Sequence, residues 1–170
     1  MKTKLTSIAL GAIMGACASS TPDTSYTVTA PVDDSFNGKT AFLVNYDTGE
    51  KIDSAIIADA TATFAGKIDE PAFARIIVEG NRLGYLIVEP GNITVKDRVA
   101  TGSTLNDMRI AIREEEERRF AERFHALEKV SPDRPTTLEG PGAEELMAEY
   151  HAFNDSVFNA NIDNPIAYIM

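Results

Sequence analysis

Few side chains in this sequence could attack a substrate, bind a metal ion or hold a cofactor. Cys17 is the single cysteine, which excludes an internal disulfide and a Cys-x-x-Cys redox pair. His125 and His151 are far apart in the sequence, whereas a zinc site needs about four convergent ligands. The chain also lacks the Gly-x-Ser-x-Gly, P-loop and dinucleotide-binding glycine patterns. We therefore predict no catalytic residue, no metal site and no cofactor, in a protein that is not an enzyme.

The densest group of carboxylates lies in the charged run Arg113–Arg119. Consecutive glutamates on a helix point in different directions, so they do not converge as a catalytic pair in one pocket. The order of acids and bases instead allows helical pairs such as Glu114 with Arg118 and Glu115 with Arg119. We interpret this run as the solvated face of a helix.

The overall charge argues against one class of partner. The net charge is −10 and the pI is near 4.6, and the basic residues are scattered among acids. Phosphate neutralisation needs clustered lysines and arginines. We therefore predict that the chain does not bind nucleic acid.

The first residues indicate export. Met1–Lys4 is basic, and Leu5–Gly15 is small, apolar and uncharged. This apolar stretch is shorter than the roughly 20 residues that span a bilayer. We interpret residues 1–16 as a secretory signal peptide.

The residues around the lone cysteine suggest its use. Met14-Gly15-Ala16-Cys17 resembles a bacterial lipobox. The resemblance implies signal cleavage between Ala16 and Cys17, with lipid on the Cys17 sulfur and on its new amino group. Each buried methylene contributes about 0.8 kcal/mol, so several acyl chains would hold the protein firmly on a membrane. The alternative is an ordinary signal peptide in which Cys17 is incidental.

Residues 17–24 are small and polar, as in a flexible tether. They lack the acidic run that marks surface export in some Gram-negative lipoproteins. We therefore predict an outer-membrane lipoprotein that faces the periplasm and meets the membrane through its lipid.

Residues 25–100 alternate strand patterns with turn residues, which predicts an antiparallel β-sandwich or barrel of about seven strands. Tyr85–Val88 is apolar at every position and should be covered on both faces, so we place it at the centre of a sheet. Ile93–Lys96 alternates and should lie nearer an edge. We expect the two to form a β-hairpin around Glu89–Asn92. The other expected strands are 25–29, 40–46, 51–58, 61–67 and 74–79.

Residues 101–170 predict a helical extension. A long helix should begin at Ser103 or Thr104. Residues 131–142 contain several prolines and glycines and should form a loop before a second helix over 143–159. The two helices should pack as an antiparallel pair. The first should contribute an apolar face of Leu105, Met108, Ile112, Phe120, Phe124 and Leu127, and the second one of Leu146, Tyr150, Phe153 and Val157.

Several short motifs, in order, resemble a known domain. They are Asp53-Ser54-Ala55, Phe64-Ala65-Gly66, Pro71, Glu89-Pro90-Gly91, and Gly102-Ser103 followed by Asn106. Together they resemble the β-rich N-terminal domain of unknown function found in Gram-negative lipoproteins of the thiol-disulfide oxidoreductase type, over roughly residues 25–125. We expect these residues to serve the fold, with Gly66 and Gly102 at special backbone angles and Asp53 and Ser54 capping a strand.

The resemblance implies a function for the chain. In such lipoproteins a thioredoxin-like domain with Cys-x-x-Cys follows, so the sequence is expected to be a fragment, or else a stand-alone copy of the N-terminal module. The module would position or dimerise the redox domain, or hold its substrate protein. The alternative is a stand-alone envelope lipoprotein that binds a glycan or a peptide through its loops.

Overall fold

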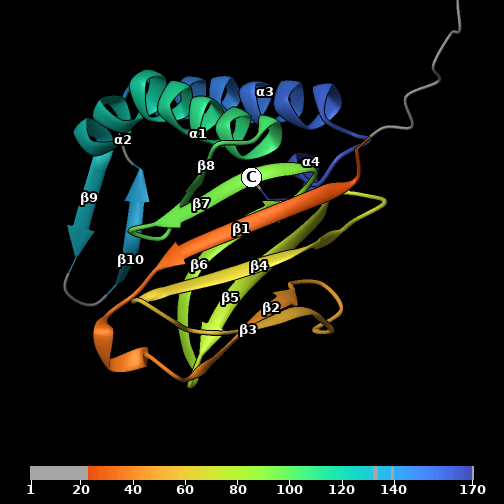
Figure 1. Ribbon diagram of the computed structural model, residues 1–170. Coiled ribbons are helices and arrows are strands. Elements are labelled where there is room, and N and C mark those ends of the chain that lie inside the picture. The colour runs from red at the N-terminus through yellow and green to blue at the C-terminus, as the bar shows by residue number, and fades with distance from the viewer. Residues whose placement is uncertain (1–22, 132–133, 139, 170) are drawn as a thin grey trace, which may run out of the picture.

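Strands fill the first part of the chain and helices the second, as the sequence predicts. The computed structural model describes residues 23–131, 134–138 and 140–169 (Figure 1). In this part of the chain, eight strands form two four-stranded sheets, and a third sheet of two strands lies between α2 and α3 in the sequence. The first sheet has the order β4 (Thr61–Lys67), β1 (Ser25–Pro31), β7 (Gly91–Lys96), β8 (Val99–Thr101), and the second β3 (Lys51–Ile56), β2 (Thr40–Asn45), β5 (Ala72–Val78), β6 (Asn81–Val88).

The two sheets enclose the main hydrophobic core. Side chains alternate between the faces of a strand, so every second residue points inward. Val28 and Phe64 fill the core from the first sheet, and Leu43, Ile76 and Leu86 fill it from the second; all five are almost completely buried. This confirms the predicted class, a mainly β domain followed by helices.

Strand β6 and strand β7 do not form the predicted hairpin. They belong to different sheets, and the turn at Glu89-Pro90 carries the chain from one sheet to the other. The prediction that β6 is central is also wrong, because β6 lies at the edge of the second sheet, paired with β5. Its apolar run is covered on both faces, but Leu86 faces the core between the sheets while Ile87 faces the helices. A layer of helices thus covers the second face of β6, so a strand at the edge of a sheet can be apolar at every position.

The first sheet is not wholly antiparallel. Strand β1 pairs antiparallel with β4 but parallel with β7, where Val28 lies opposite Ile93. Strand β7 buries Ile93 and Val95 and exposes Thr94 and Lys96, as its alternating sequence predicts. It lies one strand from the sheet edge, which is formed by β8.

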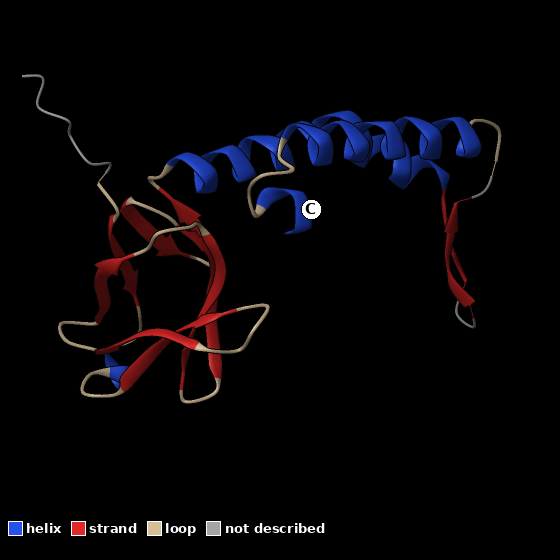
Figure 2. Cartoon of the chain, turned by 90° about the vertical axis from the view of Figure 1, so that its right-hand side faces the viewer, coloured by secondary structure: helices blue, strands red, loops and turns tan. Residues whose placement is uncertain are grey.

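The helices form a second layer with its own core. The chain continues through α1 (Thr104–Glu116), a π-helical turn η2 (Glu117–Ala121) and α2 (Glu122–Leu127), and returns through α3 (Ala143–Ala160) to the short α4 (Ile166–Ile169). Figure 2 shows the helices leading away from the β domain. The second core joins Phe73 and Ile87 of the sheet to Phe120, Leu146, Phe153, Val157 and Ile166 of the helices.

The apolar faces of both helices are confirmed, with one exception. Met108 is largely exposed, whereas the other predicted residues of both faces pack into the second core. Glu116, which interrupts the first stripe, accepts a hydrogen bond from the Tyr150 hydroxyl at 2.8 Å. A half-buried carboxylate is therefore given a partner by the opposite helix.

The charged run makes different pairs from those predicted. Glu115 pairs with Arg118, three residues on, at 2.6 Å, in place of Arg119. The run is otherwise largely exposed, as predicted.

The predicted loop over 131–142 is wrong in its first part. Strands β9 (Glu128–Ser131) and β10 (Arg134–Leu138) pair antiparallel at the far end of the helical arm (Figure 2). Proline is tolerated in an edge strand, and Pro135 lies in β10, so a proline-rich composition does not exclude a strand here. No helix in the described part of the chain is both long and apolar enough to cross a bilayer.

Candidate functional site

The residues that we predict to carry the lipid cannot be compared with the structure. Ala16, Cys17 and the signal peptide of residues 1–16 lie outside the described residues. His125 is on α2 with 88% of its side chain exposed, and His151 is on α3 and also exposed. No group of three or more potential metal ligands occurs among residues 23–131, 134–138 and 140–169.

Three of the motif residues meet at a buried joint between the β domain and the helical arm. Asn106, which is 1% exposed, accepts a hydrogen bond from the Ile87 backbone N–H at 2.9 Å and donates to the Ile87 carbonyl at 2.7 Å. The Asn106 amide therefore satisfies the open edge of β6 as a neighbouring strand would. The same amide group donates to the Ser103 hydroxyl at 2.8 Å.

Glu89 completes this joint at the start of helix α1. Its carboxylate is 6% exposed and accepts hydrogen bonds from the backbone N–H groups of Leu105 at 2.6 Å and Asn106 at 3.3 Å. The first N–H groups of a helix have no partner within the helix, and they carry partial positive charge. Ser103 occupies the N-cap position without capping through its own side chain, because Glu89 does so from the preceding loop.

A second group of motif residues is also structural. The Tyr26 hydroxyl donates to Asp53 at 3.4 Å. Burial, and then the negative charge of Asp53, raise the pKa of Tyr26 to about 12. Gly66 does not have the special backbone angle that we predicted; it leaves room for Tyr26, whose hydroxyl would lie 2.8 Å from an added Cβ. Gly102 does adopt a positive φ of 90°, as predicted.

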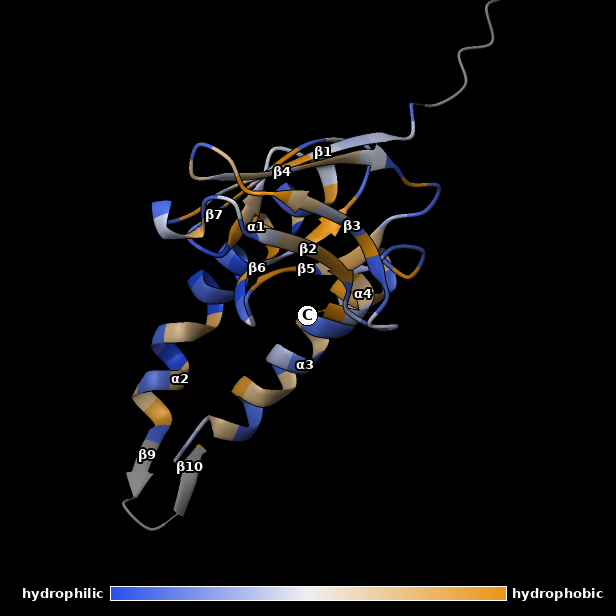
Figure 3. Cartoon of the chain, turned by 60° about the horizontal axis from the view of Figure 1, so that its bottom comes forward, coloured by the Kyte–Doolittle hydropathy of each residue, from blue (hydrophilic) through white to orange (hydrophobic). Residues whose placement is uncertain are grey.

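The candidate binding surface lies elsewhere, on the outer face of the second sheet. Tyr46, Phe73 and Tyr85 come from three neighbouring chain segments and form an aromatic triad with ring centroids 5.0–5.6 Å apart. Tyr46 is 46% exposed, whereas Phe73 is buried. Figure 3 shows hydrophobic colour on β2 and β5 beside α4. The helices cover only part of this face of the sheet, and the triad lies at their border.

Each ring of the triad is covered by an arginine. The guanidinium carbon of Arg75 lies 5.7 Å from the Tyr46 ring centre, that of Arg82 lies 4.5 Å from Tyr85, and that of Arg109 lies 5.8 Å from Phe73. These distances fall in the range of cation–π contacts. Arg82 also donates a hydrogen bond to the Tyr85 hydroxyl at 2.6 Å.

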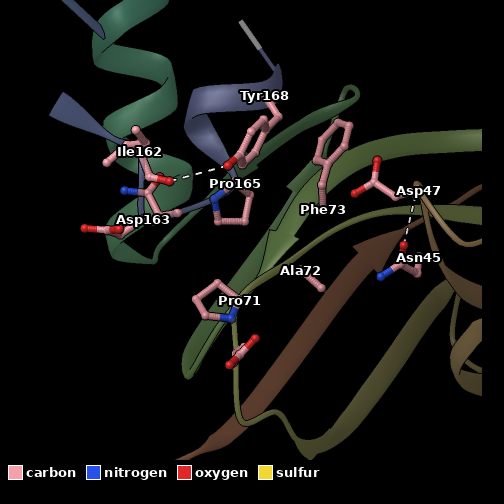
Figure 4. Close-up of a pocket in the computed structure, with 11 residues that line it drawn as sticks. Asn45, Asp47, Pro71, Ala72, Phe73, Ile162, Asp163, Pro165 and Tyr168 are labelled. Atoms are coloured by element: carbon pink, nitrogen blue, oxygen red, sulfur yellow. Dashed lines mark hydrogen bonds between the residues drawn. The ribbon is translucent and has the colours of Figure 1, made fainter. Parts of the chain in front are cut away.

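Two adjoining pockets open over the triad. A pocket of about 330 Å³ is lined by Tyr46, Asp47, Phe73, Tyr85, Arg109 and the end of α4. A second pocket of about 460 Å³ shares Asp47, Phe73 and Tyr168 with the first. In Figure 4, Tyr168 of α4 lies beside Phe73, and the Asp47 carboxylate lies on the other side of Phe73. Volumes of this size suit a small ligand or part of a peptide.

Sequence reasoning did not predict this surface. Tyr46 and Tyr85 lie in predicted strands, which aromatic residues favour, and Phe73 lies just before the predicted strand over 74–79. One signal was available: Phe73-Ala74-Arg75 places a ring and a guanidinium two residues apart, and hence on the same face of a strand. The contribution of Arg109 depends on how α1 packs on the sheet, and no local pattern indicates that packing.

Comparisons with known proteins characterise only the β domain. No curated protein matches the chain. The match found begins in β1 and ends in the first turn of α1, so it includes the buried joint. Residues 26–108 match the model of the family described as Domain of unknown function (DUF4369), and that family is what this part of the chain is similar to.

Proposed function

We propose that the chain is the lipid-anchored, non-catalytic N-terminal module of a thiol-disulfide oxidoreductase-type lipoprotein of the cell envelope. In this proposal the module positions or dimerises a redox domain, or binds the substrate protein of that domain. The observation that carries the proposal is the buried joint of Glu89 and Asn106, because it fixes the direction in which the helical arm leaves the β domain.

The arm has the properties of a spacer. Thr104 to Leu127 follow helical geometry, which at about 1.5 Å per residue gives a length of roughly 35 Å. Helix α3 returns along the arm and packs on it through Leu146 and Phe153. Arg123 of α2 pairs with Glu149 of α3 at 2.6 Å. A paired helical arm of this kind holds a partner at a set distance from the sheets.

The lipid anchor is supported by the sequence of the first 24 residues alone. A basic start, a short apolar stretch and Gly15-Ala16-Cys17 precede a polar tether. With the lipid on Cys17, the tether would connect the membrane directly to β1, since β1 begins at Ser25.

Membrane fractionation tests the anchor. The full chain, expressed in a Gram-negative host, should sediment with the membranes and be released by detergent. Cys17→Ser should instead appear in the soluble fraction, while the control Ser20→Ala in the tether should behave as the unchanged protein. Sedimentation of Cys17→Ser with the membranes to the same extent would contradict the proposal.

An insulin-reduction assay tests the absence of redox chemistry in this chain. We expect no turnover, because reduction of a disulfide by a dithiol mechanism needs two cysteines and the chain has one. Turnover that survives Cys17→Ser would show that another group carries out the reaction.

The aromatic triad favours a second candidate function, a stand-alone envelope lipoprotein that binds a glycan or a peptide. Exposed aromatic rings beside polar groups are common in binding pockets. The coding frame beyond Met170 separates the two candidates. A frame that continues to a Trp-Cys-x-x-Cys motif supports the redox module, and a stop codon supports the stand-alone binding protein.

A further inference from the structure

The arginines of the triad have no acidic partners in the described part of the chain. Arg75, Arg82 and Arg109 make no ion pair there, although the sequence holds 26 acidic and 16 basic residues. The Arg75 Nε atom is buried without a hydrogen-bond partner in the same part of the structure. A cluster of unpaired cations on a strongly acidic protein leaves a local site for an anion.

Of the three arginines, Arg109 most strongly indicates an anion site. It is half-buried against Phe73, and both this burial and the neighbouring charge of Arg113 lower the pKa of its guanidinium. Both causes act against the charged form, and a bound anion would offset both. Arg109 and Arg113 also line a common recess beside Ile169, which Glu116 borders as well.

The walls of the pocket restrict which anion fits. Tyr46, Phe73, Tyr85 and Ile169 present rings and aliphatic surface, which a small inorganic anion would leave unused. A neutral sugar could stack on the rings but would not neutralise the arginines. The carboxylate of Asp47 also lines the pocket, but its residue is exposed to solvent.

We propose that the pocket formed by β2, β5, β6, α1 and α4 binds a carboxylate attached to a flat apolar group. The carboxylate meets Arg109, because guanidinium and carboxylate form paired, charge-assisted hydrogen bonds. The flat group lies against Phe73 and Tyr85, whose rings are stacked at 5.5 Å. Such a ligand is either a small aromatic acid or a peptide that ends in an aromatic residue. This proposal depends on neither the lipid anchor nor a redox domain.

The test is isothermal titration of the purified full chain with four probes. The probes are 3-phenylpropionate, its uncharged amide, acetate, and the peptide Gly-Gly-Phe with a free carboxyl end. We expect 3-phenylpropionate to bind at least about tenfold more tightly than its amide, which cannot form charge-assisted hydrogen bonds through a carboxylate. It should exceed acetate by at least about as much, because acetate has no ring to lie against Phe73 and Tyr85. Tighter binding of the peptide than of 3-phenylpropionate identifies a peptide as the source of the carboxylate; the reverse order identifies a small aromatic acid.

Substitutions in the pocket test whether 3-phenylpropionate binds there. Arg109→Gln should weaken the binding of 3-phenylpropionate at least about tenfold, whereas Arg118→Gln should not change it. Arg118 lies further along the same helical arm and pairs with Glu115, away from the triad. Tyr46→Ala serves as a second variant, because its exposed ring contributes to the pocket without filling the core.

The outcomes decide the proposal. Weaker binding by both Arg109→Gln and Tyr46→Ala, with unchanged unfolding midpoints, supports it. No binding of any probe, equal binding of the acid and its amide, or undiminished binding by Arg109→Gln overturns it. Membrane fractionation gives its result independently, so failure of this proposal and failure of the proposed function are distinguishable.

Discussion

The side chain of Asn106 replaces a strand at the open edge of β6. It bonds both the N–H and the carbonyl of Ile87, and it is buried where water does not reach these groups. A buried backbone group that loses its partner costs about 1–3 kcal/mol. Asn106 therefore stabilises the fold more than its small contact area suggests.

We predict that Asn106→Ala lowers the free energy of unfolding by about 3 kcal/mol, because two backbone groups lose their partner at once. Urea unfolding followed by circular dichroism measures this loss. The control Asn81→Ala changes an exposed residue at the start of β6 and should stay within about 0.5 kcal/mol of the unchanged protein. Equal losses in the two variants would show that the joint does not stabilise the fold.

Tyr26 makes the stability depend on alkaline pH. Its pKa is about 12 in the folded chain, against 10.0 for an ordinary tyrosine, because of burial and the nearby Asp53 charge. The unfolded chain therefore loses this proton at a lower pH than the folded chain does. It follows that the contribution of Tyr26 to stability is complete below pH about 10 and is lost as the pH rises to about 12.

Unfolding in urea at several alkaline pH values measures this dependence. We expect the free energy of unfolding to fall between pH about 10 and about 12, and to fall less steeply in Tyr26→Phe. The same slope in both proteins would mean that another group is responsible.

At the scale of elements, the π-helical turn keeps the first helix in register with the core. Met108, Ile112, Glu116, Phe120 and Phe124 follow one another at steps of four residues. Four residues turn an α-helix by about 400°, so each step overshoots a full turn by about 40°. The wider turn at Glu117–Ala121 takes up this excess, and Phe120 remains 1% exposed.

Two single-residue deletions test this explanation. Deletion of Glu117 should restore a regular α-helix and leave Phe120 facing the core, at a cost of about 1 kcal/mol. Deletion of the exposed Ala111 should rotate all later residues by about 100° and expose Phe120, at a cost of about 3 kcal/mol or more. Thermal unfolding compares the two, and a larger loss from the Glu117 deletion would contradict the explanation.

Local patterns predict the elements of this chain better than they predict the pairing of those elements. Residues 61–67 form the predicted strand, and the predicted helix over 143–159 differs from α3 by one residue. The β6–β7 hairpin fails because a turn residue such as Gly91 shows where a strand ends but not which sheet the next strand joins. Hydrophobic cover for β6 comes from helices more than 15 residues away, and a local window does not contain them.

At the scale of the whole molecule, local sequence patterns again predict single residues better than they predict which residues come together at the candidate site. The sequence identifies Glu89 and Asn106 as motif residues, and the structure shows that their hydrogen bonds hold helix α1 against β6. The aromatic triad assembles from Tyr46, Phe73 and Tyr85, which only the pairing of β2, β5 and β6 brings together. A surface built by sheet topology does not appear in any one stretch of sequence.

The buried joint of Glu89 and Asn106 fixes the direction in which the helical arm leaves the β domain. The chain crosses between the two sheets several times and returns to the first sheet in β7 and β8. It then leaves through a helix that Glu89 and Asn106 hold against β6. Under the proposed function, this joint would set the distance and orientation between the β domain and whatever the arm carries.

Mass spectrometry of the mature N-terminus, on protein purified from the membranes of a Gram-negative host, tests this account most directly. We predict a chain that begins at Cys17 and carries a diacylglyceryl group on the sulfur and an acyl group on the amino nitrogen. A chain that begins at another residue, or an unmodified Cys17, would contradict the account.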